Sequence, residues 1–345
     1  MYLVTGATGH VGNVLVRKLL EKGQKVRALI WRGEDTRSLE GLDVEKVEGD
    51  VLDLSSLWEP LRGVRGVFHL AGVISILPGA NPWVRKVNVE GTKNVLRAAR
   101  EAGIEKLIYT SSIHAIKRIE SGVIDETAGY DPANPYGEYD RSKAEATLEV
   151  LNAARTGLEA VVVCPTGVIG PYDFRGSMTG AVIHDAVLAR PTLYVDGAYD
   201  FVDVRDVADG LIRAAEKGWR GESYILSGQR ISVRYLLETV REVTGRNFFQ
   251  MKIPFWMAQF VACFTPMYYR LAHATPRFTP YSLEVLRSNS YISHAKATRE
   301  LGYQPRSLQE TISDTVRWFL EFSNQRITQA TLRRIARELA HEQAK

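Results

Sequence analysis

Tyr139 and Lys143 are the residues of this 345-residue chain whose types and spacing point most directly to chemistry. They lie four positions apart in a stretch with helical periodicity, so their side chains are expected on one helix face, one turn apart. A phenol titrates at about 10 in water, and a neighbouring ammonium group favours the phenolate. We therefore expect Lys143 to lower the pKa of Tyr139, so that Tyr139 exchanges a proton with an alcohol–carbonyl pair. Ser112, at the end of an expected strand, would hydrogen-bond the reacting oxygen.

A Tyr–Lys pair at this spacing also occurs on solvated helices, so its weight depends on the elements that position it. The chain opens with an apolar run, Tyr2–Thr5, followed by Gly6, Gly9 and Gly12. Such glycines let the backbone turn tightly from a strand into a helix while a pyrophosphate approaches bare amides at the positive helix N-terminus. This turn predicts a dinucleotide site, and a purely steric role of the glycines is the alternative.

Strand-like and helix-like runs alternate from residue 2 to about residue 164, which is typical of a doubly wound parallel sheet, the Rossmann fold. Ligands of such sheets bind outside the carboxyl ends of the strands. We predict an α/β protein with a dinucleotide-binding domain over 1–165, to which a segment at about 200–230 returns, and a smaller, mostly substrate-binding lobe over 166–323. The six expected strands are Tyr2–Thr5, Lys25–Trp31, Val44–Glu48, Gly66–Leu70, Lys106–Thr110 and Ala160–Cys164.

The end of the second expected strand bears on cofactor choice. An acidic residue there binds the ribose diol of NAD, whereas an arginine favours the 2′-phosphate of NADP. The strand ends at Trp31-Arg32, and no acid occurs before Glu34. We therefore expect NADP(H). NAD is the alternative, in which Arg32 is solvated and Glu34 or Asp35 bends back to the ribose.

Other strand ends supply further cofactor contacts. Asp50 is expected to accept a hydrogen bond from the adenine amino group, with Val51 against the ring and Asp53 capping the next helix. His69 is expected to pack within its strand, and Lys143 to reach the nicotinamide ribose. The predicted cofactor-binding residues are Gly6, Thr8, Gly9, His10, Val11, Gly12, Trp31, Arg32, Asp50, Val51, Leu70, Ala71, Gly72, Thr110, Tyr139, Lys143, Pro165 and Val168.

The composition excludes several classes of function. A net charge of +4 is not the balance of a nucleic-acid-binding protein. The two cysteines, Cys164 and Cys263, stand in apolar surroundings without metal-ligand spacing, so no metal site is predicted. Because the first strand begins at the second residue and the cysteines are few, we expect a reduced, cytoplasmic chain.

Two late segments are open to more than one interpretation. The stretch 253–265 is apolar nearly all round but too short to span a bilayer. A buried or lobe-covering helix is favoured. The alternatives are a segment that covers an apolar substrate and a segment that rests on a membrane surface. Residues 324–345 form a basic amphipathic pattern, which predicts a terminal helix packed on its own protein or lying on anionic lipid.

Taken together, eight motifs resemble the extended short-chain dehydrogenase/reductase family, the NAD-dependent epimerase/dehydratase superfamily. The resemblance implies Ser112, Tyr139 and Lys143 as the catalytic set. It also implies a homodimer formed through the helices expected over 82–102 and 135–154. The motifs, in the family's order, are Thr5–Gly12, Gly49–Asp53, His69–Gly72, Asn88–Thr92, Tyr109–Ser112, Tyr139–Lys143, Pro165–Pro171 and Phe201–Asp206.

Within the family, the chain is most similar to the dihydroflavonol reductase and hydroxysteroid dehydrogenase branch. This implies an NADP(H)-preferring oxidoreductase that interconverts a secondary alcohol and a ketone on an apolar or polycyclic small molecule. Ser111-Ser112-Ile113 stands where sugar-nucleotide dehydratases carry Thr-Asp-Glu, and the run 165–168 lacks an asparagine usual in epimerases. A nucleotide-sugar epimerase stays an alternative, as does a non-catalytic dinucleotide-sensing regulator. His114 either lines the substrate pocket or packs its loop, and Asp203 or Asp206 is expected to cap a helix.

Overall fold

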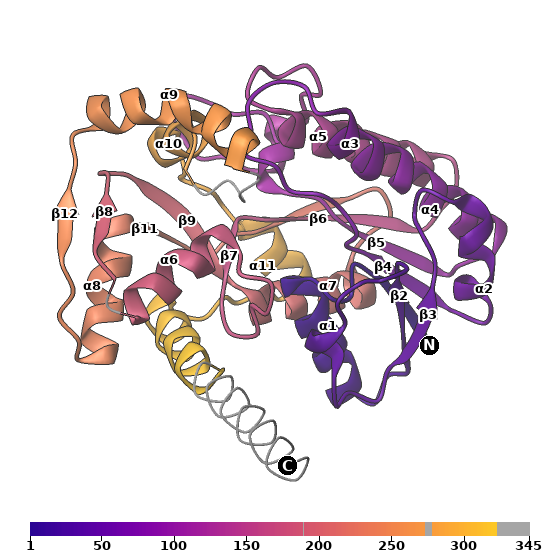
Figure 1. Ribbon diagram of the computed structural model, residues 1–345. Coiled ribbons are helices and arrows are strands. Elements are labelled where there is room, and N and C mark those ends of the chain that lie inside the picture. Colours follow the sequence, from indigo (N-terminus) through magenta and orange to yellow (C-terminus); the bar gives the residue numbers. More distant parts are fainter. Residues whose placement is uncertain (189, 273–277, 323–345) are drawn as a thin grey trace, which may run out of the picture.

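The computed structural model describes residues 1–188, 190–272 and 278–322, so the expected helix over 324–345 lies outside the described residues (Figure 1). Its centre is a seven-stranded sheet in the order β10-β6-β5-β4-β1-β2-β3, in which every neighbouring pair is parallel. The strands are β1 (Tyr2–Thr5), β2 (Val26–Ile30), β3 (Glu45–Glu48), β4 (Gly66–His69), β5 (Lys106–Thr110), β6 (Ala160–Pro165) and β10 (Ser223–Leu226).

The expected doubly wound sheet is therefore confirmed, and all six expected strands occur within a residue or two of their predicted bounds. The seventh strand, β10, was not predicted. It is only four residues long and reaches its place beside β6 after more than fifty intervening residues. Since β1, β3 and β4 are equally short, its length is not the reason: β10 lies outside the regular alternation of strands and helices, and its place is set by tertiary contacts.

Alternate residues of the strands feed two separate cores, one on each face of the sheet (Figure 1). In β1, Leu3 packs in the same cluster as Val150, whereas Val4 packs in the same cluster as Leu15 and Leu211. The helices on the Val4 side are α1 (His10–Glu21), α7 (Val204–Lys217) and α11 (Ala295–Leu301), and those on the Leu3 side include α2 (Trp58–Leu61), α4 (Gly91–Glu101) and α5 (Glu138–Arg155). Both faces of the sheet are thus covered, and only the strand ends meet loops.

The helix expected over 82–102 forms, but with a different internal geometry. It consists of α3 (Pro82–Arg85), a π-helical turn η3 (Lys86–Glu90) and α4. Asn81 caps its start as predicted, accepting a hydrogen bond from Val84 N at 3.3 Å. The π turn includes Asn88, which is buried at the edge of the site.

Apart from α7, β10 and α11, the chain after β6 builds smaller elements outside the central sheet. A three-stranded sheet joins β11 (Gln229–Ser232), β9 (Ala198–Asp203) and β7 (Gly167–Ile169), and β12 (Gln250–Lys252) pairs with β8 (Thr192–Tyr194). The division into a cofactor domain and a substrate lobe stays a prediction. The remaining helices are η1 (Arg37–Leu39), η2 (Leu54–Leu57), η4 (Ile113–Ala115), η5 (Glu126–Ala128), α6 (Met178–Val187), α8 (Val233–Thr244), α9 (Phe255–Ala272), α10 (Pro280–Arg287) and the helical residues 308–322.

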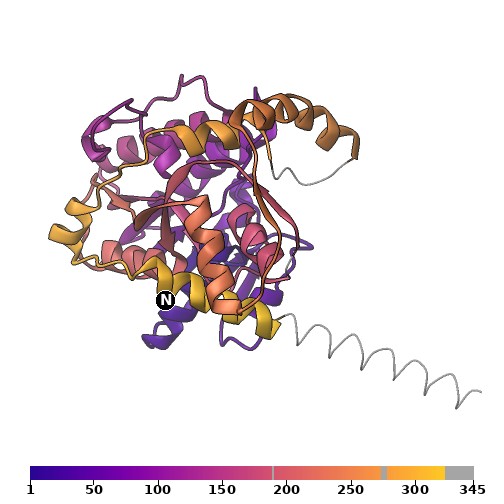
Figure 2. The same cartoon turned by 90° about the vertical axis from the view of Figure 1, so that its left-hand side faces the viewer.

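Helix α9 lies along the outer edge of the molecule, over α10 (Figures 1 and 2). Its small residues Ala258 and Ala262 are buried in a cluster with Leu283, so the helix covers this part of the protein. Several of its large side chains face outward, with Trp256 and Phe260 exposed by 68% and 65%, whereas Phe255 packs on the cluster. Across the described ranges, no helix is long and apolar enough to cross a membrane.

Candidate active site

The glycine turn between β1 and α1 forms a cradle that side chains would fill. Gly6 has a φ of +68°, and a Cβ there would lie 2.8 Å from Ala71 N. A Cβ on Gly12 would lie 2.1 Å from Gly6 O. Gly9 caps α1 without a side-chain hydrogen bond, which leaves the helix N-terminal amides for another partner. These residues fit the pyrophosphate of a dinucleotide.

At the carboxyl end of β2, Glu34 bends back toward the glycine turn. Its carboxylate accepts a hydrogen bond from Trp31 N at 3.1 Å and another from the Thr8 hydroxyl, and it pairs with Arg175 Nη2 at 2.7 Å. The Glu34 side chain is only 6% exposed. Arg32 is exposed and forms no ion pair with any residue that the structure describes. Glu34 therefore bends back toward the ribose position, which is the arrangement that the NAD alternative requires.

The two acidic residues of the turn after β3 differ in role, as expected. Asp53 caps η2, accepting a hydrogen bond from Ser55 N. Asp50 is exposed, and its carboxylate accepts a hydrogen bond from Leu52 N at 2.8 Å. Val51 is buried beside Gly91. The contact of Asp50 and Val51 with adenine stays a prediction.

The end of β4 is held over the glycine turn by polar contacts. Thr5 Oγ1 accepts hydrogen bonds from Leu70 N and Ala71 N at 3.2 and 3.1 Å. The buried His69 ring bridges Thr5 Oγ1 and Thr92 Oγ1 at 2.8 and 3.0 Å. Burial, reinforced by the Lys143 charge, lowers the pKa of His69 to about 3. His69 is therefore neutral at physiological pH and positions the loop that leads to Gly72.

Asn88 fixes the next residues of this loop. Its side-chain amide donates to Val73 O at 3.0 Å and accepts from Val73 N at 2.8 Å. It also donates to Ser142 Oγ on α5 at 3.0 Å. Asn88 thus ties the loop beside Gly72 to the helix that carries Tyr139 and Lys143. Sequence reasoning assigned Asn88 no individual role, although its motif was recognised.

Lys143 extends from α5 to the end of β5. Its Nζ donates to Thr110 O at 2.8 Å and lies 3.4 Å from Tyr109 Oη. The side chain is buried, and desolvation lowers the pKa of Lys143 to about 8. Thr110 Oγ1 is buried without a hydrogen-bond partner among the described residues. A buried, unbonded hydroxyl beside an ammonium suits the polar edge of a cofactor.

Tyr139 lies on the same helix, next to Ser112 at the end of β5. Burial raises the pKa of Tyr139 to about 12, and hydrogen bonding with Ser112 acts in the opposite direction. The expected lowering of this pKa by Lys143 is therefore not found. The physical reason is twofold: both side chains are desolvated, and the ammonium is directed at Thr110 O.

A chain of hydrogen bonds runs behind Tyr139. Tyr281 Oη donates to Asp140 Oδ1 at 2.6 Å, so its oxygen accepts from His114 Nδ1 at 3.0 Å. This assigns the proton of His114 to Nδ1 and leaves Nε2 to accept from Tyr199 Oη at 3.2 Å. The His114 ring meets Tyr139 edge-on at 6.1 Å. His114 therefore packs against the Tyr139 ring and is also hydrogen-bonded through both of its ring nitrogens.

Sequence reasoning missed Asp140 and Tyr281. Asp140 is completely buried, and its Oδ2 pairs with Arg118 Nη2 at 3.0 Å. Tyr281 comes from α10, far along the chain, and nothing in its local sequence indicates this contact. For Asp140 a signal existed, because an acid directly after Tyr139 on a helix that buries Tyr139 needs a partner. Asp203 caps α7, as predicted, by accepting from Arg205 N at 2.7 Å.

The remaining predicted residues lie at the same edge of the sheet. Pro165 ends β6 beside Leu226, and Val168 is half-buried in β7. His10 Nε2 lies 3.0 Å from Pro171 O, at the start of α1. The structure thus brings the glycine turn, the strand ends and the Ser112, Tyr139 and Lys143 set to one edge.

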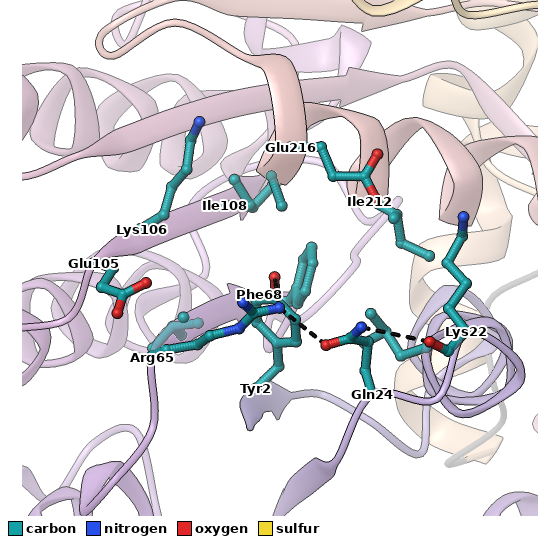
Figure 3. A pocket seen from close by; sticks show the side chains of 14 residues that line it. Tyr2, Lys22, Gln24, Arg65, Phe68, Glu105, Lys106, Ile108, Ile212 and Glu216 are labelled. Atoms are coloured by element: carbon teal, nitrogen blue, oxygen red, sulfur yellow. Dashed lines mark hydrogen bonds between the residues drawn. The ribbon is translucent and has the colours of Figure 1, made fainter.

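A hollow of about 720 Å³ lies at the opposite, amino edge of the sheet (Figure 3). Two of its three cations already have partners: Arg65 Nη2 donates to Tyr2 Oη at 2.8 Å and to Gln24 Oε1 at 2.9 Å, and Lys106 Nζ donates to Gly218 O at 2.7 Å. None of the predicted site residues lines it. Since ligands of doubly wound sheets bind at the carboxyl edge, we place the active site there.

The fold and the site together define a dinucleotide-dependent α/β enzyme with a buried Ser–Tyr–Lys set. Residues 2–227 match the NAD dependent epimerase/dehydratase family, and the chain belongs to this family. It is an NAD(P)-dependent oxidoreductase of the extended short-chain dehydrogenase/reductase type, as the motifs implied, and acts on a small molecule.

Individual relatives agree with this assignment. Sterol demethylase protein B of Methylococcus capsulatus is 38% identical and covers 92% of this chain and 98% of its own length. A Synechocystis protein assigned as a dihydroflavonol 4-reductase is 33% identical, covering 92% and 94%. The crystal structure of gox2253 is 34% identical, with a TM-score of 0.80 over 93% of this chain and 98% of that chain. The expected dihydroflavonol reductase resemblance is thereby confirmed.

Proposed function

We propose that the protein is an NADP(H)-preferring oxidoreductase that interconverts a secondary alcohol and a ketone on an apolar or polycyclic substrate. In this proposal, residues 1–165 with about 200–230 bind the cofactor, and most of 166–323 forms the substrate lobe. The observation that carries it is the burial of Tyr139 and Lys143 on one helix, next to Ser112 and at the edge that holds the glycine turn. The cofactor, when bound, supplies or accepts the hydride.

The protein's own residues handle the proton and the oxygen. Tyr139, with a pKa of about 12, is protonated at neutral pH and can donate its proton to the carbonyl oxygen during reduction. Ser112 hydrogen-bonds that oxygen and stabilises the charge that develops on it. The Lys143 ammonium, present below its pKa of about 8, is held at the end of β5 by Thr110 O and would bind the nicotinamide ribose of the cofactor, which ties the position of the cofactor to Tyr139. In the oxidation direction the same groups act in reverse.

Replacing Tyr139 by Phe tests this assignment. The variant keeps the ring but loses the proton, so we expect kcat to fall by about 10³-fold or more, within the range of general acid–base catalysis. Dissociation constants for NADPH, measured by fluorescence, should stay within about threefold of wild type. Tyr235→Phe, at an exposed position on α8, is the matched control. Unchanged turnover in Tyr139→Phe would remove this residue from its assigned role.

A net change in cofactor absorbance separates the oxidoreductase from the epimerase alternative. An alcohol–ketone oxidoreductase consumes one reduced cofactor for each ketone reduced, whereas an epimerase shows no net consumption. We expect stoichiometric oxidation of NADPH when ketosteroids or other polycyclic ketones are screened. Product inversion of a sugar nucleotide without cofactor consumption would instead support the epimerase.

The apolar substrate class rests on α9 and on the neighbouring α10. Helix α9 packs on α10, whose Tyr281 is bonded to His114 beside Tyr139. Helix α9 thus borders an element that reaches the catalytic residues, and we propose that the substrate entrance lies beside α9. The name of the Methylococcus relative, a sterol demethylase protein, supports the same class. Unchanged substrate KM in a Trp256→Ala/Phe260→Ala double variant would contradict this route.

We further propose peripheral contact of α9 with a lipid surface, in a chain that works in the cytoplasm. Trp256, Phe260 and Phe264 form an outward apolar face, and the outward Tyr268 is suited to an interface. Both cysteines are free thiols, as expected of a reducing compartment. Co-sedimentation with phosphatidylglycerol vesicles should be strong for wild type and lost in the double α9 variant.

A homodimer through α3, α4 and α5 completes the proposal. Ion pairs of Arg85 with Glu145 at 2.5 Å and of Lys93 with Glu149 at 3.5 Å join these helices into one surface. Leu148 is exposed by 40% on that surface. Sedimentation velocity should show a dimer for wild type and a monomer for Leu148→Arg. A wild-type monomer at micromolar concentration would contradict the dimer.

A further inference from the structure

We propose that Arg175, held in place by Glu34, is the residue that recognises the 2′ position of the adenosine ribose and sets the choice between NADP and NAD. The inference rests on the proposed function, because it requires the dinucleotide to lie along the glycine turn. It replaces the assignment that the sequence favoured, in which Arg32 reads the 2′-phosphate.

The position of Arg175 is set by the segment that follows β7. This segment crosses the start of α1, where Asn13 Nδ2 donates to Tyr172 O at 3.2 Å. Tyr172 has a φ of +67° although it is not a glycine, and the Arg17 guanidinium lies 4.7 Å from its ring centre. Because these contacts fasten the segment to α1, Arg175 reaches the end of β2 from 141 positions away in the sequence.

The charges at the end of β2 leave only one acid to pair with Arg175 directly. Asp35, the other acid of this turn, is paired with Arg37, whose Nη2 lies 2.6 Å from Asp35 Oδ2. Asp35 is therefore not the carboxylate that holds Arg175. Glu34 bonds Arg175 and Thr8 on the face toward the glycine turn. The ribose position therefore meets one carboxylate and one guanidinium that are already in contact.

The Glu34–Arg175 pair can bind either cofactor, but different hydrogen bonds must be broken and formed in each case. The diol of NAD donates hydrogen bonds, which the Glu34 carboxylate accepts while Arg175 stays paired. The 2′-phosphate of NADP is repelled by Glu34 and attracted by Arg175, so Arg175 must change partners. The Arg175 side chain is 49% exposed, but its Nη2 donates to Thr8 Oγ1 at 2.5 Å as well as pairing with Glu34, so both bonds must be exchanged for the phosphate. Glu34 is in addition fixed by Trp31 N. Arginine bonds phosphate in a bidentate, charge-assisted way, which gives the discrimination.

The test uses 2′,5′-ADP and 5′-AMP as probes, because they differ only by the 2′-phosphate and take no part in turnover. Titration calorimetry of the full chain gives both dissociation constants. We expect Arg175→Ala to weaken binding of 2′,5′-ADP by about 30-fold and of 5′-AMP by less than threefold. Glu34→Gln should strengthen binding of 2′,5′-ADP and weaken that of 5′-AMP, each by about tenfold. Arg32→Ala is the matched control, at an exposed arginine that forms no ion pair with the described residues, and both constants should change by less than threefold.

The outcomes separate this inference from the proposed function. If Arg175→Ala leaves the ratio of the two constants unchanged while both probes bind, the inference is overturned and the oxidoreductase assignment is untouched. The same holds if Arg32→Ala shifts the ratio instead. If the ratio shifts as expected but Tyr139→Phe retains full turnover, the proposed chemistry fails and the cofactor inference stands. Binding of neither probe by the wild-type chain would overturn both.

Discussion

The carboxyl edge of the central sheet buries polar side chains, whereas α9 exposes apolar ones. At the edge, Asp140, Lys143 and His69 are buried by 95% or more, and each has named hydrogen-bond partners. On α9, Trp256 and Phe260 have two-thirds of their surface in solvent. Both arrangements are unfavourable for an isolated chain, since buried charge loses hydration and exposed apolar surface orders water.

The two regions differ in what offsets the unfavourable free energy of burying polar groups or exposing apolar ones. At the strand ends, the protein itself supplies the compensation, through a network that reaches from Arg118 to Tyr199. On α9, the described residues offer no such network for Trp256 and Phe260, and the helix is attached through its buried alanines and Phe255. We infer that the strand-end site is complete within the fold, whereas α9 is shaped for something that the fold does not provide.

The largest effect is expected at Lys143. Replacing it by Met removes the buried charge, and we expect kcat/KM for ketone reduction to fall by about 10³-fold, equivalent to about 4 kcal/mol. Burial lowers the pKa of Lys143 to about 8, so wild-type kcat/KM should be flat below pH 8 and fall about tenfold per unit above it. The sign follows from the ammonium being the active form.

Lys143→Arg is the control for this pH dependence, because its charge persists above pH 12. Its activity should not decline between pH 8 and 10, even if it is low throughout. A wild-type profile that rises across this interval would show that the ammonium is not required and would contradict the role given to Lys143.

The second effect concerns stability at Asp140. Replacing this buried carboxylate by Asn leaves Arg118, whose side chain is 16% exposed, with only Glu284 as a carboxylate partner among the described residues. Breaking such a pair should lower the free energy of unfolding by about 3 kcal/mol, measured by urea denaturation. Asp35→Asn, at the exposed pair with Arg37, is the matched control and should leave stability nearly unchanged. Equal effects of the two variants would remove the distinction between the buried edge and the surface.

Much of the strand-end site could be predicted from the sequence because its signals are local. The glycine turn, the six strands and the spacing of Tyr139 and Lys143 each depend on fewer than twenty consecutive residues. Burial and distant partners are not local properties. The helical spacing predicted a lowered Tyr139 pKa, but it could not show that desolvation would raise it instead. Likewise Arg175 reaches the site from a loop, and Tyr281 from helix α10, along paths that are set by the whole fold.

The apolar stretch of α9 shows the same limit in another form. Its nearly uniform hydrophobicity favoured a buried or lobe-covering helix. In the structure the helix does cover its neighbours, because Ala258 and Ala262 are buried against them. The outward direction of the large residues could not be predicted, since a pattern that is apolar all round contains no polar face to orient it.

The third effect is a pH dependence of stability from His69. Burial lowers its pKa from 6.5 to about 3 in the folded protein, so the unfolded chain binds the extra proton between these values. Stability from this group is therefore complete above pH 6.5 and is lost as pH falls toward 3. Between pH 7 and 5 the loss should be about 2 kcal/mol. Denaturation of His69→Gln should show a smaller decline over the same interval, and an identical decline would contradict the assignment.

The smallest effect on stability is expected on α9. Trp256→Ala and Phe260→Ala remove side chains that contact little within the protein, so each should change the free energy of unfolding by less than about 0.5 kcal/mol. Ala258→Leu on the same helix forces three carbons into a filled cluster and should cost about 1–3 kcal/mol. This order reverses the usual one, in which removing a large apolar residue costs most. If the Trp256 variant proves as destabilised as the Ala258 one, the outward face of α9 is packed against the protein in solution, and it is then unavailable to lipid or substrate.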